Sequence, residues 1–317
     1  MKDLCMRRYR KNISLSRGFR DRAYAKGDKN IKEIMQKIIE NQEFGGERPL
    51  YHTSDLLLRN VTIHAGESAL KETRNITAEH CRFEGKYPFW LTDGFKVSDC
   101  LFTEGARAAL WYSNDLEMTR CRIEAPKMFR DMKRLSLKDV EIPDAGETMW
   151  HCDDIKLENV KVKNAPYIFM HCSNIRIDGY EQEGNYSFQY CKNIEIHNAK
   201  IYSKDAFWNS ENVTVYDSEI IGEYLAWHSK NVRFVNCTIG ETQPLCYAEG
   251  LVMENCRLRE DADLAFEYSD VVADIKGNVT SIKNPRSGRI DVDSVGEIIL
   301  DENIKAPGDC KIVCRNK

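Results

Sequence analysis

The chain has 317 residues, a length that fits either one large domain or two ordinary ones. Its 46 Lys and Arg against 50 Asp and Glu give a formal charge of −4, which argues against nucleic acid as a partner. No run approaches the roughly 18 consecutive apolar residues of a membrane span. Residues 1–22 are basic and lack the apolar core of a signal peptide. The composition therefore predicts a cytoplasmic protein without a membrane or nucleic-acid partner.

Cysteine usage agrees with a reducing compartment. Most of the 12 cysteines recur at fixed positions of a repeat, as Cys81, Cys100 and Cys121 do. A periodic thiol is better explained as a small core residue than as half of a disulfide. We therefore expect buried, reduced cysteines. Cys310 and Cys314 near the end of the chain form too weak a pattern to predict a metal site.

Residues 1–34 differ from the rest of the chain because Lys and Arg far outnumber Asp and Glu there. A charge run of this kind is typical of a flexible extension, which is the interpretation we favour. The alternatives are an arm that binds an anionic partner and a stretch that precedes the true start at Met35.

A repeat of 19 to 21 residues dominates the remainder. Its first apolar column is Leu56, Ile76, Phe95, Leu116, Leu135, Ile155, Ile175, Ile194, Val213, Val232 and Leu251. A second apolar column follows two positions later, and a column rich in Asn, Asp and Gly two positions after that, as in Ile175-x-Ile177-x-Gly179. Alternation of period two is typical of strands, and Asn, Asp and Gly tolerate the left-handed backbone of a corner.

Each repeat thus predicts two short strands, a variable loop, a third strand and a corner. The expected fold class is all-β: a single-stranded right-handed parallel β-helix with three strands and about 19–21 residues per coil. Ile39-x-Asn41-x-x-Phe44 matches a segment one repeat later, so the array is expected to begin near Lys37. We expect the β-helix over residues 35–304, with an atypical closing cap beyond Asp270 and a peripheral tail over residues 305–317.

Several segments also resemble an uncharacterised bacterial family. They are Phe44–Tyr51, Gly66–Lys71, Tyr87–Trp90, Ala108–Trp111, Tyr186–Tyr190, Asp205–Trp208 and Gln243–Tyr247. That family is known only as a domain of unknown function with a right-handed parallel β-helix fold. The resemblance spans about residues 35–304. It implies the same fold and implies no activity.

All five tryptophans occupy one position of the predicted third strand. This position holds Trp90, Trp111, Phe129, Trp150, Met170, Gln189, Trp208, Trp227, Cys246 and Glu267. The preceding column, from Phe89 to Phe266, is apolar throughout and is expected to point inward, so alternation predicts that the tryptophans point outward. The other outward position is mostly small, and a groove is expected there: Pro88, Ala109, Thr148, Ser187, Ala206 and Pro244.

The column after the tryptophans is polar and is expected to form a rim beside the corner. It holds Tyr112, Arg130, His151, His171, Tyr190, Asn209, His228, Tyr247 and Tyr268. His151 and His171 come from adjacent coils about 5 Å apart, which suggests a metal or acid–base role. Two histidines without a third ligand do not predict a metal site, and none is expected.

The carboxylates on the third strand are Glu147, Asp205 and Glu267. Glu147 and Asp205 lie three coils apart, about 14 Å, which exceeds the roughly 6.5–9.5 Å of an inverting carboxylate pair. With His151 and His171 they are the catalytic candidates, and none is decisive. The acidic pair at residues 153–154 falls in a corner and is interpreted as structural. No phosphate-binding loop or nucleophile motif occurs, so no cofactor is expected.

An exposed aromatic strip of this length would exceed the few hundred Å² that a monomer commonly leaves bare. The leading hypothesis is therefore a carbohydrate-binding β-helix without catalysis, in which the rings stack on a glycan and the rim binds its hydroxyls. The first alternative is a structural protein that forms a homodimer through the strip. Rings covered by loops, and a polysaccharide hydrolase or lyase, remain as further alternatives.

Overall fold

The computed structural model describes residues 36–301, 303 and 308–316. The extension predicted over residues 1–34 and the start at Met35 lie outside the described residues. Among the described residues the chain is almost entirely β-structure, with one short 3-10 helix, η1, at Glu104–Ala106. We describe the unit formed by residues 36–317 by itself.

The strands follow one another in short coils. Those of the first half are β1 (Lys37–Glu40), β2 (Glu43–Glu47), β3 (Ser54–Arg59), β4 (Thr62–Glu67), β5 (Arg74–Glu79), β6 (Arg82–Phe83), β7 (Asp93–Ser98), β8 (Leu101–Phe102), β9 (Asn114–Thr119), β10 (Arg122–Ile123) and β11 (Lys133–Ile142). Those of the second half are β12 (Asp153–Val162), β13 (Ser173–Glu183), β14 (Lys192–Tyr202), β15 (Glu211–Tyr216), β16 (Glu219–Ile221), β17 (Lys230–Val235), β18 (Thr238–Gly240), β19 (Leu251–Leu258), β20 (Asp270–Lys283), β21 (Ser287–Ile299) and β22 (Lys311–Cys314).

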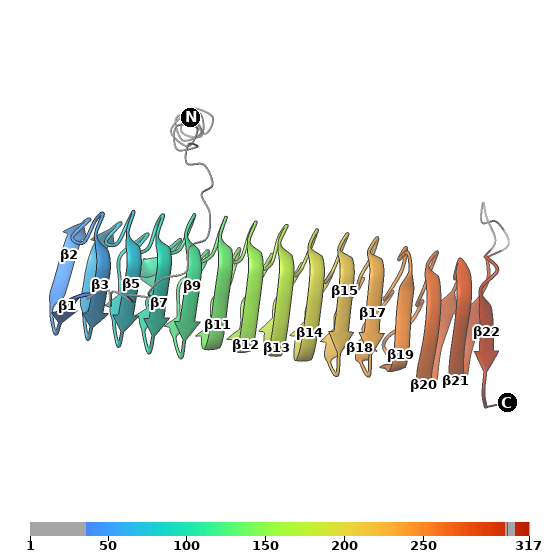
Figure 1. The fold of residues 1–317 in the computed structure, drawn as a ribbon. Helices are drawn as coiled ribbons and strands as arrows, with labels where there is room; N and C mark the ends of the chain where they lie inside the picture. The colour runs from blue at the N-terminus through green and yellow to red at the C-terminus, as the bar shows by residue number, and fades with distance from the viewer. Residues whose placement is uncertain (1–35, 302, 304–307, 317) are drawn as a thin grey trace, which may run out of the picture. The chain divides into compact units, whose positions relative to one another are not determined.

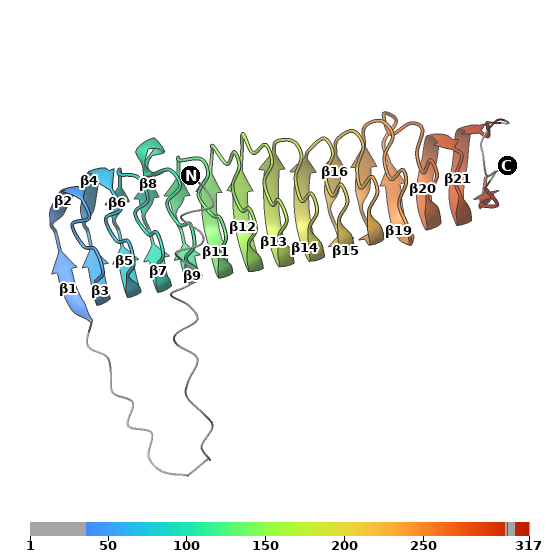
Figure 2. The same ribbon diagram turned by 90° about the horizontal axis from the view of Figure 1, so that it is seen from above.

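Every strand pairs in parallel with the strand one coil away. Ile155 of β12 lies opposite Ile175 of β13, which lies opposite Ile194 of β14. Figures 1 and 2 show the coils stacked in chain order from β1 to β22, with β3, β5 and β7 beside one another and β4, β6 and β8 on a second side. The predicted fold class is confirmed: the chain is a parallel β-helix of about 14 turns.

The predicted apolar columns form the core. Ile155, Ile175 and Ile194 are buried, as are the Phe89-to-Phe266 positions. Eleven cysteines of the described chain are free thiols, and nine of them are buried, including Cys81, which sits in the same column as Cys100 and Cys121. Stacking identical columns buries each coil's apolar face against the next coil, so the core is continuous along the axis.

The corners are left-handed, as predicted. Asn60, Asp99, Asn159 and Asn198 have φ between 51° and 56°. Glycine is needed at one such corner: at Gly179 (φ 73°) an added Cβ would lie 2.6 Å from Asn159 Oδ1. A second corner carries a file of amides, in which Asn193 Nδ2 donates to Asn174 Oδ1 at 3.0 Å and Asn212 Nδ2 donates to Asn193 Oδ1 at 3.1 Å.

The prediction of a third strand in each coil is wrong, because the aromatic segments do not form β-strands. The aromatic segments are turns, and from Glu147 onward every second residue in them is left-handed, as at Tyr167, Phe169 and His171 (φ 57°, 57° and 54°). Their N–H groups bond carbonyls of the neighbouring coils, so the backbone is satisfied without β-conformation: Phe169 N donates to Thr148 O at 3.2 Å and His171 N to Gln189 O at 3.1 Å. Left-handed non-glycine residues cost about 1–2 kcal/mol each, and burial of their apolar side chains offsets that cost.

The end of the chain also differs from the expectation. The tail over residues 305–317 was expected to lie apart from the β-helix, but β22 pairs in parallel with β21 between Arg289–Lys311 and Val292–Cys314. The apolar residue Ile312 packs against the core beside Cys310. The solenoid pattern thus continues past the predicted boundary at residue 304. Within the atypical segment expected beyond Asp270, the pairing register of β20 with β21 shifts between Ile275 and Asn278.

Candidate functional site

Three parallel files of side chains make up the aromatic side of the β-helix. The central file, which we call the aromatic strip, is Trp90, Trp111, Arg130, Trp150, Met170, Gln189, Trp208, Trp227 and Cys246. The rim file is Tyr112, Asp131, His151, His171, Tyr190, Asn209, His228, Tyr247 and Tyr268. The loop-side file is Tyr87, Lys127, Glu147, Tyr167, Tyr186, Asp205 and Tyr224. Backbone bonds fix this alignment, because the rim N–H groups from Tyr112 to Asn209 donate to the strip carbonyls of the next coil, as Tyr112 N does to Arg130 O at 3.0 Å.

One coil is aligned differently from the prediction. Phe129 was expected in the outward Trp column but is fully buried, and Arg130 takes its place in the strip, bridged to Trp150. Asp131 then occupies the rim, where its N–H bonds Trp150 O at 2.9 Å. The predicted step from Leu110 to Met128 was 18 residues, shorter than the 19 to 21 found elsewhere, and this was the signal that the column had slipped by one.

The groove predicted beside the tryptophans does not exist as such. All six small residues at the preceding position are buried: Pro88, Ala109, Thr148, Ser187, Ala206 and Pro244. The prediction assumed that side chains alternate between the two faces, which holds only for extended backbone. In these turns two successive side chains, such as Ala109 and Leu110, both point into the core.

The five tryptophans are half-buried, and their rings are packed against one another. The centroids of Trp90 and Trp111 are 5.4 Å apart, and those of Trp208 and Trp227 are 5.6 Å apart. The Arg130 guanidinium is sandwiched between two indoles, 4.3 Å from the Trp111 centroid and 4.5 Å from that of Trp150. At least one face of each of these rings is therefore covered within the strip.

Three indole N–H groups are also satisfied internally. Trp111 Nε1 donates to Lys127 O at 2.7 Å, Trp150 Nε1 to Tyr167 O at 2.5 Å and Trp227 Nε1 to Gln243 O at 2.8 Å. These bonds tie each ring to the backbone of the following coil, so the strip is rigid. A partner would meet a preorganised surface whose indole donors are mostly already used.

The rim file is exposed and carries the polar groups that face solvent. His151 and His171 stack with centroids 5.2 Å apart and an interplanar angle of 1°, and Tyr190 continues the stack at 4.9 Å. Burial, followed by the neighbouring His151, lowers the pKa of His171. Parallel rings do not aim their nitrogens at a common point, and the described residues contain no group of three His, Cys, Asp or Glu that could hold a metal.

The two predicted acids do not form a pair. Both lie in the loop-side file, with Tyr167 and Tyr186 of the intervening coils between them. Glu147 is engaged by Lys127 at 2.9 Å and lies 4.0 Å from Arg130. Asp205 is 7% exposed, and burial raises the pKa of its carboxyl. Its neighbour Lys204 is bonded to Glu223 at 2.9 Å instead.

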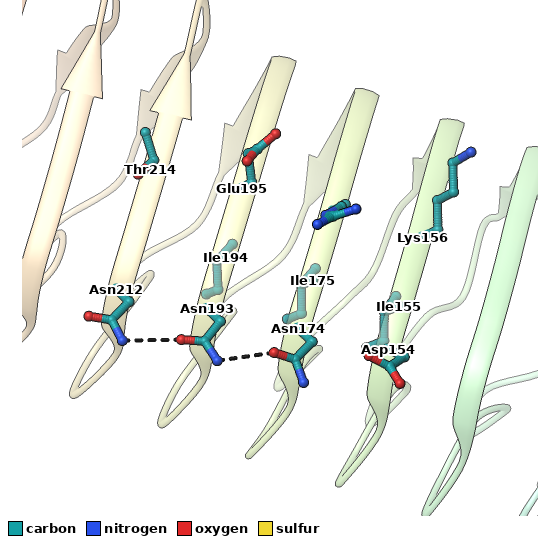
Figure 3. Close-up of a pocket in the computed structure, with 11 residues that line it drawn as sticks. Asp154, Ile155, Lys156, Asn174, Ile175, Asn193, Ile194, Glu195, Asn212 and Thr214 are labelled. Atoms are coloured by element: carbon teal, nitrogen blue, oxygen red, sulfur yellow. Dashed lines mark hydrogen bonds between the residues drawn. The ribbon is translucent and has the colours of Figure 1, made fainter.

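The structure also has a groove that the sequence interpretation missed. It has a volume of about 610 Å³ and crosses β12 to β15 on the side next to the rim file. Figure 3 shows Asp154 and the amides of Asn174, Asn193 and Asn212 along one wall, with Lys156 and Glu195 along the other. These asparagines lie at a corner, where an amide is expected for backbone reasons alone, and nothing in a periodic column distinguishes a structural amide from one that also lines a groove.

A family comparison agrees with this fold. The chain belongs to the family described as "Protein of unknown function (DUF3737)". The family model matches residues 37–313, which includes β22. The resemblance predicted from the sequence is thereby confirmed, and no curated protein matches the chain. Among the described residues of this DUF3737 member, no helix is long and apolar enough to cross a membrane.

Solved β-helix structures are similar to the DUF3737 member at low levels. The A-module of an Azotobacter vinelandii mannuronan C-5 epimerase is 11% identical with a TM-score of 0.33, over 89% of this chain and 90% of that one. PfbA, a surface adhesin of Streptococcus pneumoniae, is 7% identical with a TM-score of 0.32, over 87% and 84%. The catalytic domain of a GH87 alpha-1,3-glucanase is 10% identical with a TM-score of 0.32, over 88% and 63%. These values are too low to assign an activity.

Proposed function

We propose that this protein binds an extended glycan along the aromatic strip and does not transform it. The observation that supports this best is the run of half-buried side chains Trp90, Trp111, Arg130 and Trp150, continued after Met170 and Gln189 by Trp208 and Trp227, beside a polar rim. The apolar C–H groups of a sugar make dispersion contacts with the accessible parts of the indoles, while rim hydroxyls, imidazoles and amides bond sugar hydroxyls. The arrangement is rigid, which lowers the entropy lost on binding.

The rim residues give the cleanest test, because removing one polar tip leaves the packing intact. Tyr190 is 44% exposed, and Tyr190→Phe deletes only its hydroxyl. In titrations of tryptophan fluorescence with a panel of hexasaccharides, we expect this variant to bind the recognised glycan about three- to tenfold more weakly. Tyr202→Phe is the matched control, since Tyr202 is equally exposed (43%) but lies outside the three files. Equal affinities for both variants, or no glycan that quenches the wild type, would contradict the proposal.

Self-association through the strip is the second candidate. Self-association is favoured because three indole N–H groups already donate to backbone carbonyls and the rings pack against one another. The strip itself therefore offers an apolar surface with few donors for sugar hydroxyls. Sedimentation equilibrium decides between the two. If the wild type is a dimer and Trp208→Ala, which loses no indole hydrogen bond to backbone, becomes a monomer, the strip is a protein interface rather than a glycan site.

A further inference from the structure

The groove lined by Asn174, Asn193 and Asn212 carries two neighbouring cations without acidic partners in the part of the chain that the structure describes. Lys156 and Arg176 project from adjacent coils in register, so two cations stand side by side on its outer wall. Across the described residues, neither side chain forms an ion pair with a carboxylate. The acid in register with Arg176 on its other side, Glu195, bonds His197 at 3.2 Å instead.

Neighbouring columns show how cations are usually balanced in this β-helix. Lys161 lies 3.2 Å from Glu181, and Lys192 lies 3.0 Å from Glu211, each pair joining two successive coils. Like charges directly opposite each other destabilise a sheet. The pair formed by Lys156 and Arg176 is therefore a local cost that the fold alone does not require.

The opposite wall supplies hydrogen-bond donors. Asn193 Nδ2 and Asn212 Nδ2 each use one hydrogen for the amide oxygen of the preceding coil, at 3.0 and 3.1 Å. An amide nitrogen carries two hydrogens, so each retains one N–H for another acceptor. Figure 3 shows these amides along the edge of the groove, with the strand residues between them and the outer wall.

We propose that this groove binds an oxyanion, a carboxylate or a phosphate, carried by a polyhydroxylated ligand. Lys156 and Arg176 hold the anionic group, because a guanidinium binds an oxyanion through two parallel bonds and an ammonium adds a point charge. The amides of Asn193 and Asn212 bind neighbouring hydroxyl or carbonyl oxygens. Asp154 at one end of the groove disfavours a second negative charge there, which limits the ligand to one anionic group at the cation pair.

This site is separate from the aromatic strip, so the two proposals can fail independently. The probes are galacturonate and glucose 6-phosphate, which carry one anionic group each, and the neutral methyl ester of galacturonate, each titrated calorimetrically at low ionic strength. We expect at least one of the two anions to bind, and the neutral ester to bind at least about tenfold more weakly than the acid if the carboxylate is the recognised group. Glucose 6-phosphate binding alone assigns the phosphate. Failure of both anions to bind the wild type overturns the proposal.

Variants locate the site. Arg176→Gln and Lys156→Gln should each weaken the bound anion about three- to tenfold, whereas Lys192→Gln, which removes a cation already paired with Glu211, should change it less than twofold. Lys156→Glu distinguishes loss of the anion site from loss of folding. It places an acid opposite Arg176, so the thermal midpoint should hold or rise slightly while anion binding is lost. Unchanged anion affinity in Lys156→Glu would overturn the assignment.

Discussion

Tyr180 and Gln182 form a pair of buried polar side chains. Both are buried, and the Tyr180 hydroxyl donates to Gln182 Oε1 at 3.1 Å. Gln182 Nε2 has no hydrogen-bond partner and is itself buried. A buried donor left unsatisfied costs about 1–3 kcal/mol, more than a single neutral hydrogen bond returns.

The double variant Tyr180→Phe/Gln182→Leu should therefore be more stable than the wild type by about 1 kcal/mol. Gln182→Leu alone should gain less, because it leaves the Tyr180 hydroxyl without its acceptor. Urea unfolding followed by circular dichroism measures both. If the double variant is less stable than Gln182→Leu alone, the prediction is contradicted. That result would mean that Gln182 Nε2 has an acceptor in solution, such as a buried water.

His64 is a titrating residue on the surface of β4. Its Nε2 lies 2.9 Å from Glu43 and its Nδ1 lies 3.1 Å from Glu84. The hydrogen bonds to Glu43 and then Glu84 raise the pKa of His64 above 6.5. Because the folded pKa is raised, the contribution of His64 to stability is fully present below its unfolded value and is lost as the pH rises through the folded pKa.

We expect His64→Gln to lower the thermal midpoint at about pH 5.5 and to leave it nearly unchanged at about pH 8.5. Differential scanning calorimetry of the two proteins across this interval is the measurement, with the NMR titration of the His64 ring as a direct check of its pKa. His197, which bonds a single carboxylate at 3.2 Å, provides a matched control in His197→Gln. A pH-independent difference would rule out the linkage.

At the scale of one element, the left-handed corner explains where glycine is required. Gly179 and Gly94 both have positive φ, 73° and 65°. An added Cβ meets Asn159 Oδ1 at 2.6 Å in the first case and nothing within 4 Å in the second. A substitution at Gly94 therefore measures only the free-energy cost of a left-handed backbone, whereas one at Gly179 adds the cost of a steric clash.

Gly94→Ala should lower the free energy of unfolding by about 1–2 kcal/mol, the cost of a left-handed alanine. Gly179→Ala should lower it further, because the Asn159 side chain must also move and its bond to Asp139 at 3.1 Å is disturbed. Chemical denaturation of the two variants tests the order. Equal losses would mean that Asn159 adapts without cost.

At the scale of the whole described unit, each coil contacts mainly the coils next to it. The rings of Phe169, Phe188 and Phe207 stack through three successive coils, with centroids 4.4 and 5.0 Å apart. In such an array, stability is close to a sum of coil and interface contributions, so damage is local before it is global.

Phe188→Ala should cost about 3–5 kcal/mol because it leaves a cavity between two packed rings. Hydrogen exchange measured by mass spectrometry should show faster exchange first in β13, β14 and β15. The coils around β3 and β5 should keep their wild-type protection. Uniform loss of protection along the chain would indicate that the β-helix unfolds as one cooperative unit.

The sequence by itself determined the β-helix, its coil length, the buried apolar and cysteine columns and the left-handed corners. It could do so because a solenoid repeats its contacts once per coil, so residues that stack along the axis recur at a fixed spacing in the chain. Ile155, Ile175 and Ile194 carry that information directly, since each lies opposite the next.

Only the tertiary structure decided which way the aromatic segments face and what lines the groove. Left-handed residues such as Phe169 (φ 57°) turn two successive side chains inward, and polarity with a period of two cannot predict that. The hydrogen-bond register of one coil puts Arg130, rather than Phe129, between Trp111 and Trp150. The charge of the groove depends on which side chains form ion pairs with adjacent coils. Periodicity places Lys156 opposite Arg176 but does not show that both lack an acid.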